Sequence, residues 1–189
     1  MHKSLTIDPV WTLFLDRDGV LNRRLPDLYV TSVEEFEFLP GVLDSLAVLS
    51  KMFAHIIVVT NQQGIAKGLL TSQQLDTVHQ YMEQKIVEAG GCIDAVYYCG
   101  ELAFLPYNCR KPSPVMAYKA LEDYPDIDFT KSLMVGDAIS DVAFGQSLGM
   151  KTALIGEKLG YPDPEEKFIP DYLLHDLSSV LSILNLQPG

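Results

Sequence analysis

The sequence predicts an α/β protein built on a doubly wound parallel sheet with helices on both faces. Short apolar runs typical of buried strands recur along the chain, and most are separated by segments with the three- and four-residue apolar spacing of amphipathic helices. Strands that alternate with helices form a parallel sheet covered on both sides. The expected strands are residues 11–15, 55–60, 93–99, 132–136 and 151–155. The expected helices are residues 40–49, 72–89, 114–123, 138–148 and 176–184.

Two of the expected helices have recognisable ends. Pro40 stands near the start of the first helix, where the fixed φ angle of proline suits the opening turn. Thr71 or Ser72 can cap the second helix, and the glycine pair at residues 90–91 is expected to end it. These signals fix the helices on either side of the second expected strand.

Two stretches lack a regular pattern. Residues 19–39 are too polar and irregular for a core helix, so we expect a loop or small hairpin that lies over the strand ends. Residues 156–189 carry no catalytic motif and are expected to supply the edge of the sheet and a closing helix.

The length and composition indicate a single domain over residues 1–189, and we expect a protein that works in the cytoplasm. Hydrophobic residues make up 48% of the chain and the mean hydropathy is +0.12, which excludes disordered and fibrous classes. No apolar run reaches the length of a membrane span, and no signal-peptide core is present, so we expect no membrane partner. The net charge of −11 is the opposite of that of a nucleic-acid-binding protein.

Two acidic residues follow the first expected strand, within the stretch Leu-Phe-Leu-Asp-Arg-Asp-Gly-Val at residues 13–20. Ligands bind at the carboxyl ends of strands in open α/β sheets, which is where Asp16 and Asp18 stand. In near-extended backbone both side chains project to one side, and their mutual repulsion is relieved by a shared proton or by a cation such as Mg²⁺. The pair is a candidate metal and phosphate site, although a plain acidic loop gives the same pattern.

Polar residues also follow the second and third expected strands. Thr60 and Asn61 offer a hydroxyl and backbone N–H groups that can cradle phosphate oxygens, but these residues are also ordinary turn formers. Arg110 and Lys111 offer a bidentate fork and a compact charge suited to phosphate, or they form a solvated basic turn. Each pair is ambiguous by itself.

The fourth expected strand is followed by Asp137, with Asp141 four residues later. These acids can complete a metal site or cap the next helix. Because all four groups follow strands of one parallel sheet, we expect them to converge on one edge. The order Asp-x-Asp-Gly, Thr-Asn, Lys-Pro and Gly-Asp-x-x-x-Asp resembles the haloacid dehalogenase superfamily of aspartate-nucleophile phosphatases.

This resemblance implies a two-step phosphoryl transfer. Asp16 would attack phosphorus to form an aspartyl-phosphate, and Asp18 would protonate the leaving alcohol and then activate water. Mg²⁺ would be held by Asp16, the backbone carbonyl of Asp18, and Asp137. Three further groups would neutralise the phosphate oxygens: Lys111, Thr60 and the backbone N–H of Asn61. Asp141 would support the metal or position Lys111.

The spacing of the motifs leaves no room for the cap domains common in this superfamily. Only 44 positions separate Asp16 from Thr60, and the loop, helix and strand expected there use most of them. The interval from Cys99 to Lys111 is shorter still. We therefore expect a capless enzyme in which loops select the substrate.

Within the capless branch, the chain resembles the D-glycero-D-manno-heptose 1,7-bisphosphate 7-phosphatases. The resemblance is carried by residues 14–22, 29–30, 36–42, 60–68, 97–99 and 109–112. It implies removal of the 7-phosphate from a small sugar bisphosphate. Histidinol-phosphate phosphatases share the Asp-Arg-Asp-Gly and Cys-Arg-Lys-Pro segments, so histidinol phosphate or another small phosphomonoester is the alternative substrate.

Two non-enzymatic interpretations stay open. A phospho-receiver signalling domain also places Mg²⁺ and an acceptor Asp on a doubly wound sheet, but its acceptor ends a middle strand. Here Asp16 and Asp18 both follow the first strand, which favours turnover. A binding-only relative is disfavoured because every catalytic position is filled.

A bisphosphate substrate needs local positive charge in a protein of net charge −11. Arg110, beside Lys111 on an expected substrate-facing loop, is the predicted contact for the distal phosphate, and Lys67 is a weaker candidate.

A structural zinc ion, common on the loop before Arg-Lys-Pro in bacterial members of the family, is not expected here. Only Cys99 and Cys109 stand where four Cys or His ligands are needed. Three cysteines at irregular spacing suggest reduced thiols. We expect packing of Phe104, Leu105 and Tyr107 to hold the loop instead.

Overall fold

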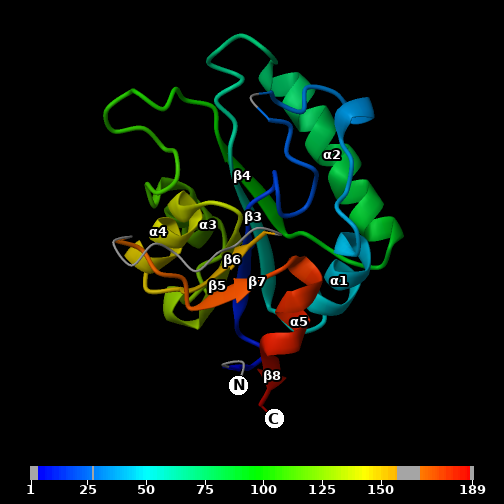
Figure 1. The fold of residues 1–189 in the computed structure, drawn as a ribbon, viewed down its shortest axis with the longest axis vertical. Helices are drawn as coiled ribbons and strands as arrows, with labels where there is room; N and C mark the ends of the chain where they lie inside the picture. The colour runs from blue at the N-terminus through cyan, green and yellow to red at the C-terminus, as the bar shows by residue number, and fades with distance from the viewer. Residues whose placement is uncertain (1–3, 27, 157–166, 188–189) are drawn as a thin grey trace.

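The computed structural model describes residues 4–26, 28–156 and 167–187. Its main element is a six-stranded sheet in which every pairing is parallel (Figure 1). In spatial order the strands are β4 (Ala95–Cys99), β3 (His55–Asn61), β2 (Thr12–Leu15), β5 (Ser132–Gly136), β6 (Lys151–Ile155) and β7 (Tyr172–Leu174). The predicted parallel α/β fold is confirmed, and the five predicted strands match the observed ones closely.

The carboxyl-terminal part of the chain forms shorter elements than predicted. The expected helix at 176–184 is a 3₁₀ turn, η3 (Leu177–Ser179), followed by the short helix α5 (Val180–Ile183). The chain then enters β8 (Leu184–Leu186), which pairs in parallel with β1 (Leu5–Ile7) in a separate two-stranded sheet. The predicted sheet edge is supplied by β7, whereas residues 157–166 lie outside the described residues. Strands of three residues are too short to leave a periodic pattern in sequence.

Helices cover both faces of the six-stranded sheet, as predicted. The helices α1 (Val42–Leu49), α2 (Ser72–Glu88) and α5 pack on one face, and α3 (Val115–Asp123) and α4 (Ile139–Ser147) pack on the other (Figure 1). The predicted start of α2 is confirmed: the Thr71 hydroxyl accepts from the Gln74 N–H at 3.1 Å, and the Gln74 side chain accepts from the Thr71 N–H at 2.8 Å. This reciprocal pair satisfies two N–H groups at the helix end.

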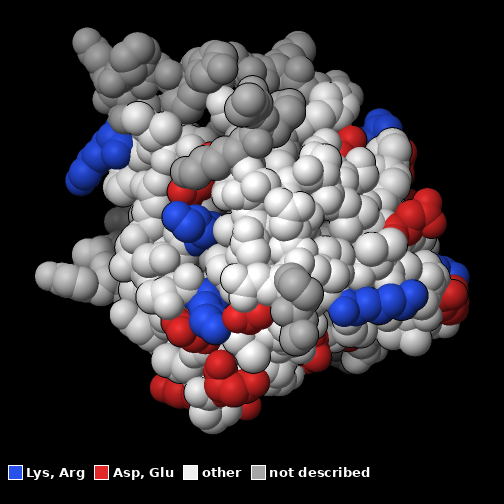
Figure 2. Space-filling view, turned by 90° about the horizontal axis from the view of Figure 1, so that it is seen from below, with Lys and Arg blue, Asp and Glu red and all other residues white. Residues whose placement is uncertain are grey.

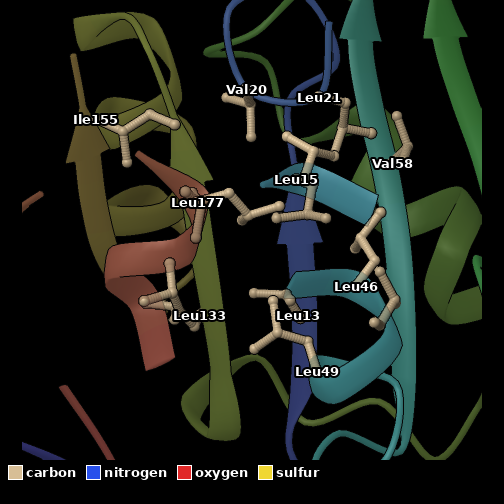
Figure 3. Packing of buried hydrophobic residues seen from close by; sticks show 14 of the residues in the cluster. Leu13, Leu15, Val20, Leu21, Leu46, Leu49, Val58, Leu133, Ile155 and Leu177 are labelled. Carbon is tan, nitrogen blue, oxygen red and sulfur yellow. The ribbon is translucent and has the colours of Figure 1, made fainter. Parts of the chain in front are cut away.

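The alternation of side chains along β2 divides the core into two clusters. Leu13 and Leu15 are fully buried against α1 and α5, while Phe14 is fully buried on the opposite face. Figure 3 shows the first cluster, in which Leu46 and Leu49 of α1 lie beside the β2 leucines. Burying each such side chain stabilises the fold by about 1.5–3 kcal/mol. The packed core on both faces holds β2 rigidly in the centre of the sheet.

The strand order reverses next to β2, and this fixes where a ligand can bind. From β2 the chain moves outward to β3 and β4, then returns to β5 on the other side of β2. In open α/β sheets, the crevice at such a reversal lies at the carboxyl ends of the strands and is the preferred ligand site. The described residues of 19–26 and 28–39 form the predicted irregular loop, whose 3₁₀ turn is η1 (Val33–Glu35). The described residues between β2 and β3 form only η1 and α1, so they contain no cap domain.

Charged side chains of both signs are interspersed on the face seen from below. Several Lys and Arg side chains lie there beside Asp or Glu side chains, and the described residues on this face form no continuous basic patch (Figure 2). The described residues on this face therefore form no basic stripe of the kind that nucleic-acid-binding proteins present. Among the described helices, none combines the length and the apolar character needed to cross a membrane.

Candidate active site

A cavity of about 480 Å³ opens at the carboxyl edge of the sheet, where β2, β3 and β5 end. The structure brings together in its wall every side chain that the sequence suggested: Asp16, Asp18, Thr60, Asn61, Arg110, Lys111, Asp137 and Asp141. Asp16 directly follows β2 and Asp137 directly follows β5, its neighbour in the sheet. The convergence results from parallel strands that all end at one edge.

A buried lysine connects two of the acids. The Lys111 ammonium lies 2.7 Å from a carboxylate oxygen of Asp16 and 2.7 Å from one of Asp141, and it donates to the Val59 carbonyl at 2.7 Å. Burial lowers the pKa of Lys111, but the carboxylates of Asp141 and Asp16 outweigh burial and the net shift is upward. Lys111 is therefore a fixed positive charge at the base of the cavity.

The surroundings of Asp16 disfavour the charged form of its carboxyl group. Burial raises the pKa of Asp16, and despite the attraction of Lys111 the value reaches about 6, with Asp141 and Asp18 adding repulsion. Such a carboxylate is stabilised by any cation that enters the cavity. The arrangement favours a positively charged ligand beside Asp16.

The second acid of the motif is held by three side chains. Asp18 accepts from Arg17 at 2.9 Å through both oxygens, from the Asn22 amide at 2.9 Å and from the Gln62 amide at 2.7 Å. Burial alone raises the pKa of Asp18, but the Arg17 charge and these hydrogen bonds shift it below its usual value. The carboxylate is therefore ionised and fixed in direction when the cavity holds no anion.

Asp137 and Gly19 approach each other closely at the mouth of the cavity. A Cβ atom on Gly19 would collide with the Asp137 carboxylate, and the φ angle of 92° at Gly19 is in the left-handed region that favours glycine. Asp137 accepts from Arg24 at 2.8 Å through Oδ2, while its buried Oδ1 has no hydrogen-bond partner among the residues that the structure describes. One carboxylate oxygen of Asp137 is thus buried without a donor among the described residues.

The acidic groups of the cavity fit a hard divalent cation. Asp16, Asp137 and Asp141 each offer one oxygen, and these oxygens lie within 4.8 Å of one another. Burial raises the pKa of Asp137 as well, with added repulsion from Asp16. Oxygen ligands with unrelieved negative charge are the donor set that Mg²⁺ prefers. Asp141 is already ion-paired with Lys111, so its position suits the support of that lysine.

Thr60 and Asn61 close the cavity beside Lys111. The Asn61 side chain accepts from the Lys111 backbone N–H at 2.9 Å, next to a cis Lys111–Pro112 peptide bond. The Thr60 hydroxyl is buried and accepts from the Gln62 amide at 2.9 Å. The end of β3 therefore positions the loop that carries Lys111, in addition to facing the cavity.

Comparison with known proteins identifies the family. The sequence model of the HAD-hydrolase-like family matches residues 108–180. A D-glycero-beta-D-manno-heptose-1,7-bisphosphate 7-phosphatase from Escherichia coli is 35% identical over 185 residues, covering 93% of this chain and 94% of the relative. The chain belongs to this phosphatase family. It is a phosphomonoesterase of the haloacid dehalogenase-like class.

Other members of the heptose bisphosphate phosphatase family agree in sequence and in fold. A D-glycero-alpha-D-manno-heptose-1,7-bisphosphate 7-phosphatase from Mycobacterium bovis is 36% identical over 138 residues, covering 73% of each chain. The D,D-heptose 1,7-bisphosphate phosphatase from B. bronchiseptica, solved in complex with magnesium and phosphate, superposes with a TM-score of 0.81 at 29% identity. That match covers 92% of this chain and 97% of the other. The similarity therefore spans nearly the whole chain.

Sequence reasoning missed several residues of the phosphatase cavity. Arg24, Leu28 and Tyr29 line it from the loop between β2 and α1, and Arg24 reaches Asp137, which is 113 positions away. For Arg24, the only signal in the sequence was an arginine pair inside a loop of an acidic chain. Gln62 was also missed, because no pattern indicates that an amide after β3 will contact Asp18.

The prediction for the loop before Arg110 was wrong. Cys99 and Cys109 form a disulfide, with Cα atoms 5.5 Å apart, instead of remaining as reduced thiols. Phe104 is 79% exposed and Tyr107 is fully exposed, so these side chains do not pack the loop against the protein. The loop instead doubles back from the end of β4, which brings the two sulfurs together and ties Arg110 to the sheet.

This disulfide predicts a specific labelling result. Under non-reducing denaturing conditions, iodoacetamide is expected to modify Cys92, the one free cysteine of the described chain, and to modify Cys99 and Cys109 only after reduction. Peptide mass spectrometry measures the modification at each position. Full labelling of Cys99 without reductant would show that the pair is open in solution.

Proposed function

We propose that this chain removes the 7-phosphate of D-glycero-D-manno-heptose 1,7-bisphosphate, with Asp16 as nucleophile. One observation carries the proposal: Asp16, Asp18, Lys111 and Asp137 converge in a single cavity of a chain that aligns over nearly its whole length with heptose bisphosphate phosphatases. A receiver domain, which forms a long-lived phosphoprotein, would lack an acid beside the Asp that accepts the phosphate. Here Asp18 is held within the same cavity as Asp16.

The proposed reaction has two steps on Asp16. In the first, a carboxylate oxygen forms a bond to phosphorus while the bond from phosphorus to the sugar oxygen breaks, and Asp18 gives its proton to the leaving alkoxide. An approaching phosphate dianion favours protonation of Asp18, since a nearby like charge raises the pKa of a carboxyl group. In the second step, Asp18 takes a proton from a water molecule, whose oxygen forms a bond to phosphorus. The bond from phosphorus to the Asp16 oxygen breaks, which releases phosphate and restores the Asp16 carboxylate.

The charge of the phosphoryl group is neutralised by the groups around Asp16. Lys111 lies 2.7 Å from Asp16, so its ammonium can contact an oxygen of a phosphate bound there. The Thr60 hydroxyl and Asn61 backbone N–H are proposed to bind the remaining oxygens. Asp16, the Asp18 carbonyl and Asp137 would hold Mg²⁺, which when bound shields the negative charge of the phosphate.

The distal phosphate is proposed to bind Arg110. One of its terminal nitrogens is buried and has no hydrogen-bond partner in the described part of the chain, and the side chain lines the cavity. Arg24 and Lys67 line the same cavity and add positive charge. We expect Arg110→Ala to raise KM about tenfold or more for a bisphosphate and to change KM little for a monophosphate. Steady-state kinetics with both substrates measures this, and equal effects would contradict the role.

A phosphate-release screen tests the substrate. It compares heptose 1,7-bisphosphates of both anomers with histidinol phosphate, fructose 1,6-bisphosphate and other small phosphomonoesters. The relatives include enzymes named for the α and for the β anomer at 36% and 35% identity, so both anomers belong in the screen. The proposal expects the highest kcat/KM with a heptose bisphosphate. Higher kcat/KM with histidinol phosphate would assign the alternative substrate instead.

A further inference from the structure

A fully buried arginine lies behind the acid of the proposed reaction. The Arg17 guanidinium donates from one terminal nitrogen to both oxygens of Asp18 at 2.9 Å. Its other terminal nitrogen lies 3.1 Å from Nε2 of His79, a residue of α2 that is itself only 6% exposed. Its Nε atom has no hydrogen-bond partner among the described residues. Two contacts therefore fix the guanidinium: Asp18 in front and His79 behind.

The chemistry of the contact defines the state of His79. Arginine can only donate hydrogen bonds, so Nε2 of His79 must be the acceptor and the ring must be neutral, with its proton on Nδ1. Burial lowers the pKa of His79 to about 3, and the Arg17 charge acts in the same direction. The imidazole packs near the Tyr98 ring, with ring centroids 5.9 Å apart. His79 is therefore a neutral acceptor in a fixed place.

We propose that His79 is a positioning residue that holds Arg17, and through Arg17 aims the Asp18 carboxyl group at the leaving group. This inference rests on the proposed acid role of Asp18. Without an acceptor at position 79, one buried terminal nitrogen of Arg17 loses its partner, and the guanidinium shifts toward other acceptors. Asp18 would keep Asn22 and Gln62 as donors but lose the Arg17 nitrogen that contacts both of its oxygens and sets its direction.

The variant His79→Leu separates this role from a general loss of packing. A misplaced acid slows the departure of a sugar alkoxide, which needs a proton, much more than the departure of 4-nitrophenolate, which needs none. We expect kcat/KM for the best sugar phosphate of the screen to fall about tenfold or more, with KM nearly unchanged. With 4-nitrophenyl phosphate, kcat/KM is expected to fall less than about threefold. Equal losses on both substrates, or no loss on the sugar phosphate, would overturn the inference.

Two further substitutions at position 79 keep the test decisive if the leucine variant folds poorly. The amide oxygen of His79→Gln can accept from Arg17, so this variant is expected to recover most of the activity on the sugar phosphate. His79→Glu can ion-pair with Arg17 and draw the guanidinium away from Asp18, so it is expected to lose activity while remaining folded. A fully active Glu variant, or an inactive Gln variant with native circular dichroism, would contradict positioning through Arg17.

A double-mutant cycle distinguishes failure of this inference from failure of the proposed mechanism. In an Asp18→Asn background, His79→Leu is expected to cause no further loss, because the group it positions is already gone. If Asp18→Asn alone keeps full turnover, the proposed acid role is wrong. If Asp18→Asn is inactive but His79→Leu is fully active, only the role of His79 is wrong. The matched control is His55→Leu. His55 is the first residue of β3, and its ring contacts Asp126.

Discussion

Asp16→Asn is expected to reduce phosphate release at least about 10³-fold, the scale seen when a nucleophile is removed from an enzyme. The amide has the size of the carboxylate and can keep a hydrogen bond to Lys111, but it cannot form an acyl-phosphate. Release of inorganic phosphate from the best substrate of the screen measures the loss. Phosphate that stays bound to the wild-type protein after acid quenching, and that is absent from the variant, would identify the covalent intermediate.

The fold of this variant is expected to be intact. Since burial and neighbouring acids raise the pKa of Asp16 to about 6, the charged carboxylate is disfavoured there, and a neutral amide is not expected to lower Tm. Thermal unfolding without added metal provides the control. Substantial turnover by folded Asp16→Asn would exclude the covalent mechanism.

Lys111→Met is expected to reduce both activity and stability strongly. The lysine is the buried positive charge between Asp16 and Asp141, and its side chain is 1% exposed. Removing one partner of a buried ion pair leaves uncompensated charge and costs about 3–5 kcal/mol. We therefore expect the free energy of unfolding at neutral pH to fall by about this amount, and turnover to be lost. Chemical denaturation and phosphate release measure the two effects.

A second substitution checks the cause of the instability. In Lys111→Met/Asp141→Asn one of the unpaired charges is gone, so part of the lost stability is expected to return while activity stays absent. Lys67→Met is the matched control for stability, since the Lys67 side chain is exposed. Among the described residues its ammonium contacts only Tyr29: it lies 3.2 Å from the hydroxyl and over the ring. The free energy of unfolding of this variant is expected to change by less than about 0.5 kcal/mol. An equally stable Lys111→Met protein would show that the buried charges are compensated in another way.

The features that sequence reasoning predicted well are those that local pattern and topology determine. Each of the five predicted strands is a short apolar run, and helices between them require a parallel sheet. Once the sheet is parallel, residues at or just beyond the carboxyl ends of β2, β3 and β5 must meet at one edge. This is why Asp16, Thr60 and Asp137 could be placed in one cavity before any distance was known.

The features that were missed depend on how loops fold across the sheet. The ion pair of Arg24 with Asp137 joins residues far apart in sequence, and no periodicity links them. The same holds for the contact of Arg17 with His79, since nothing in α2 marks one buried position as polar. The disulfide was missed because an odd number of cysteines suggested none, while the path of the loop decides which pair can meet.

The pairing of β1 with β8 brings the beginning and the end of the described chain together. Leu5 lies opposite Leu184 and Ile7 opposite Leu186, next to the amino end of β2 and so away from the cavity. In Figure 1, β8 and the dark blue start of the described chain lie together at the bottom. Joining them with a short linker and opening the chain at an exposed loop is therefore expected to give a circular permutant that still folds. For the same reason, the protein can be attached to a surface by either end with its catalytic edge facing the solution.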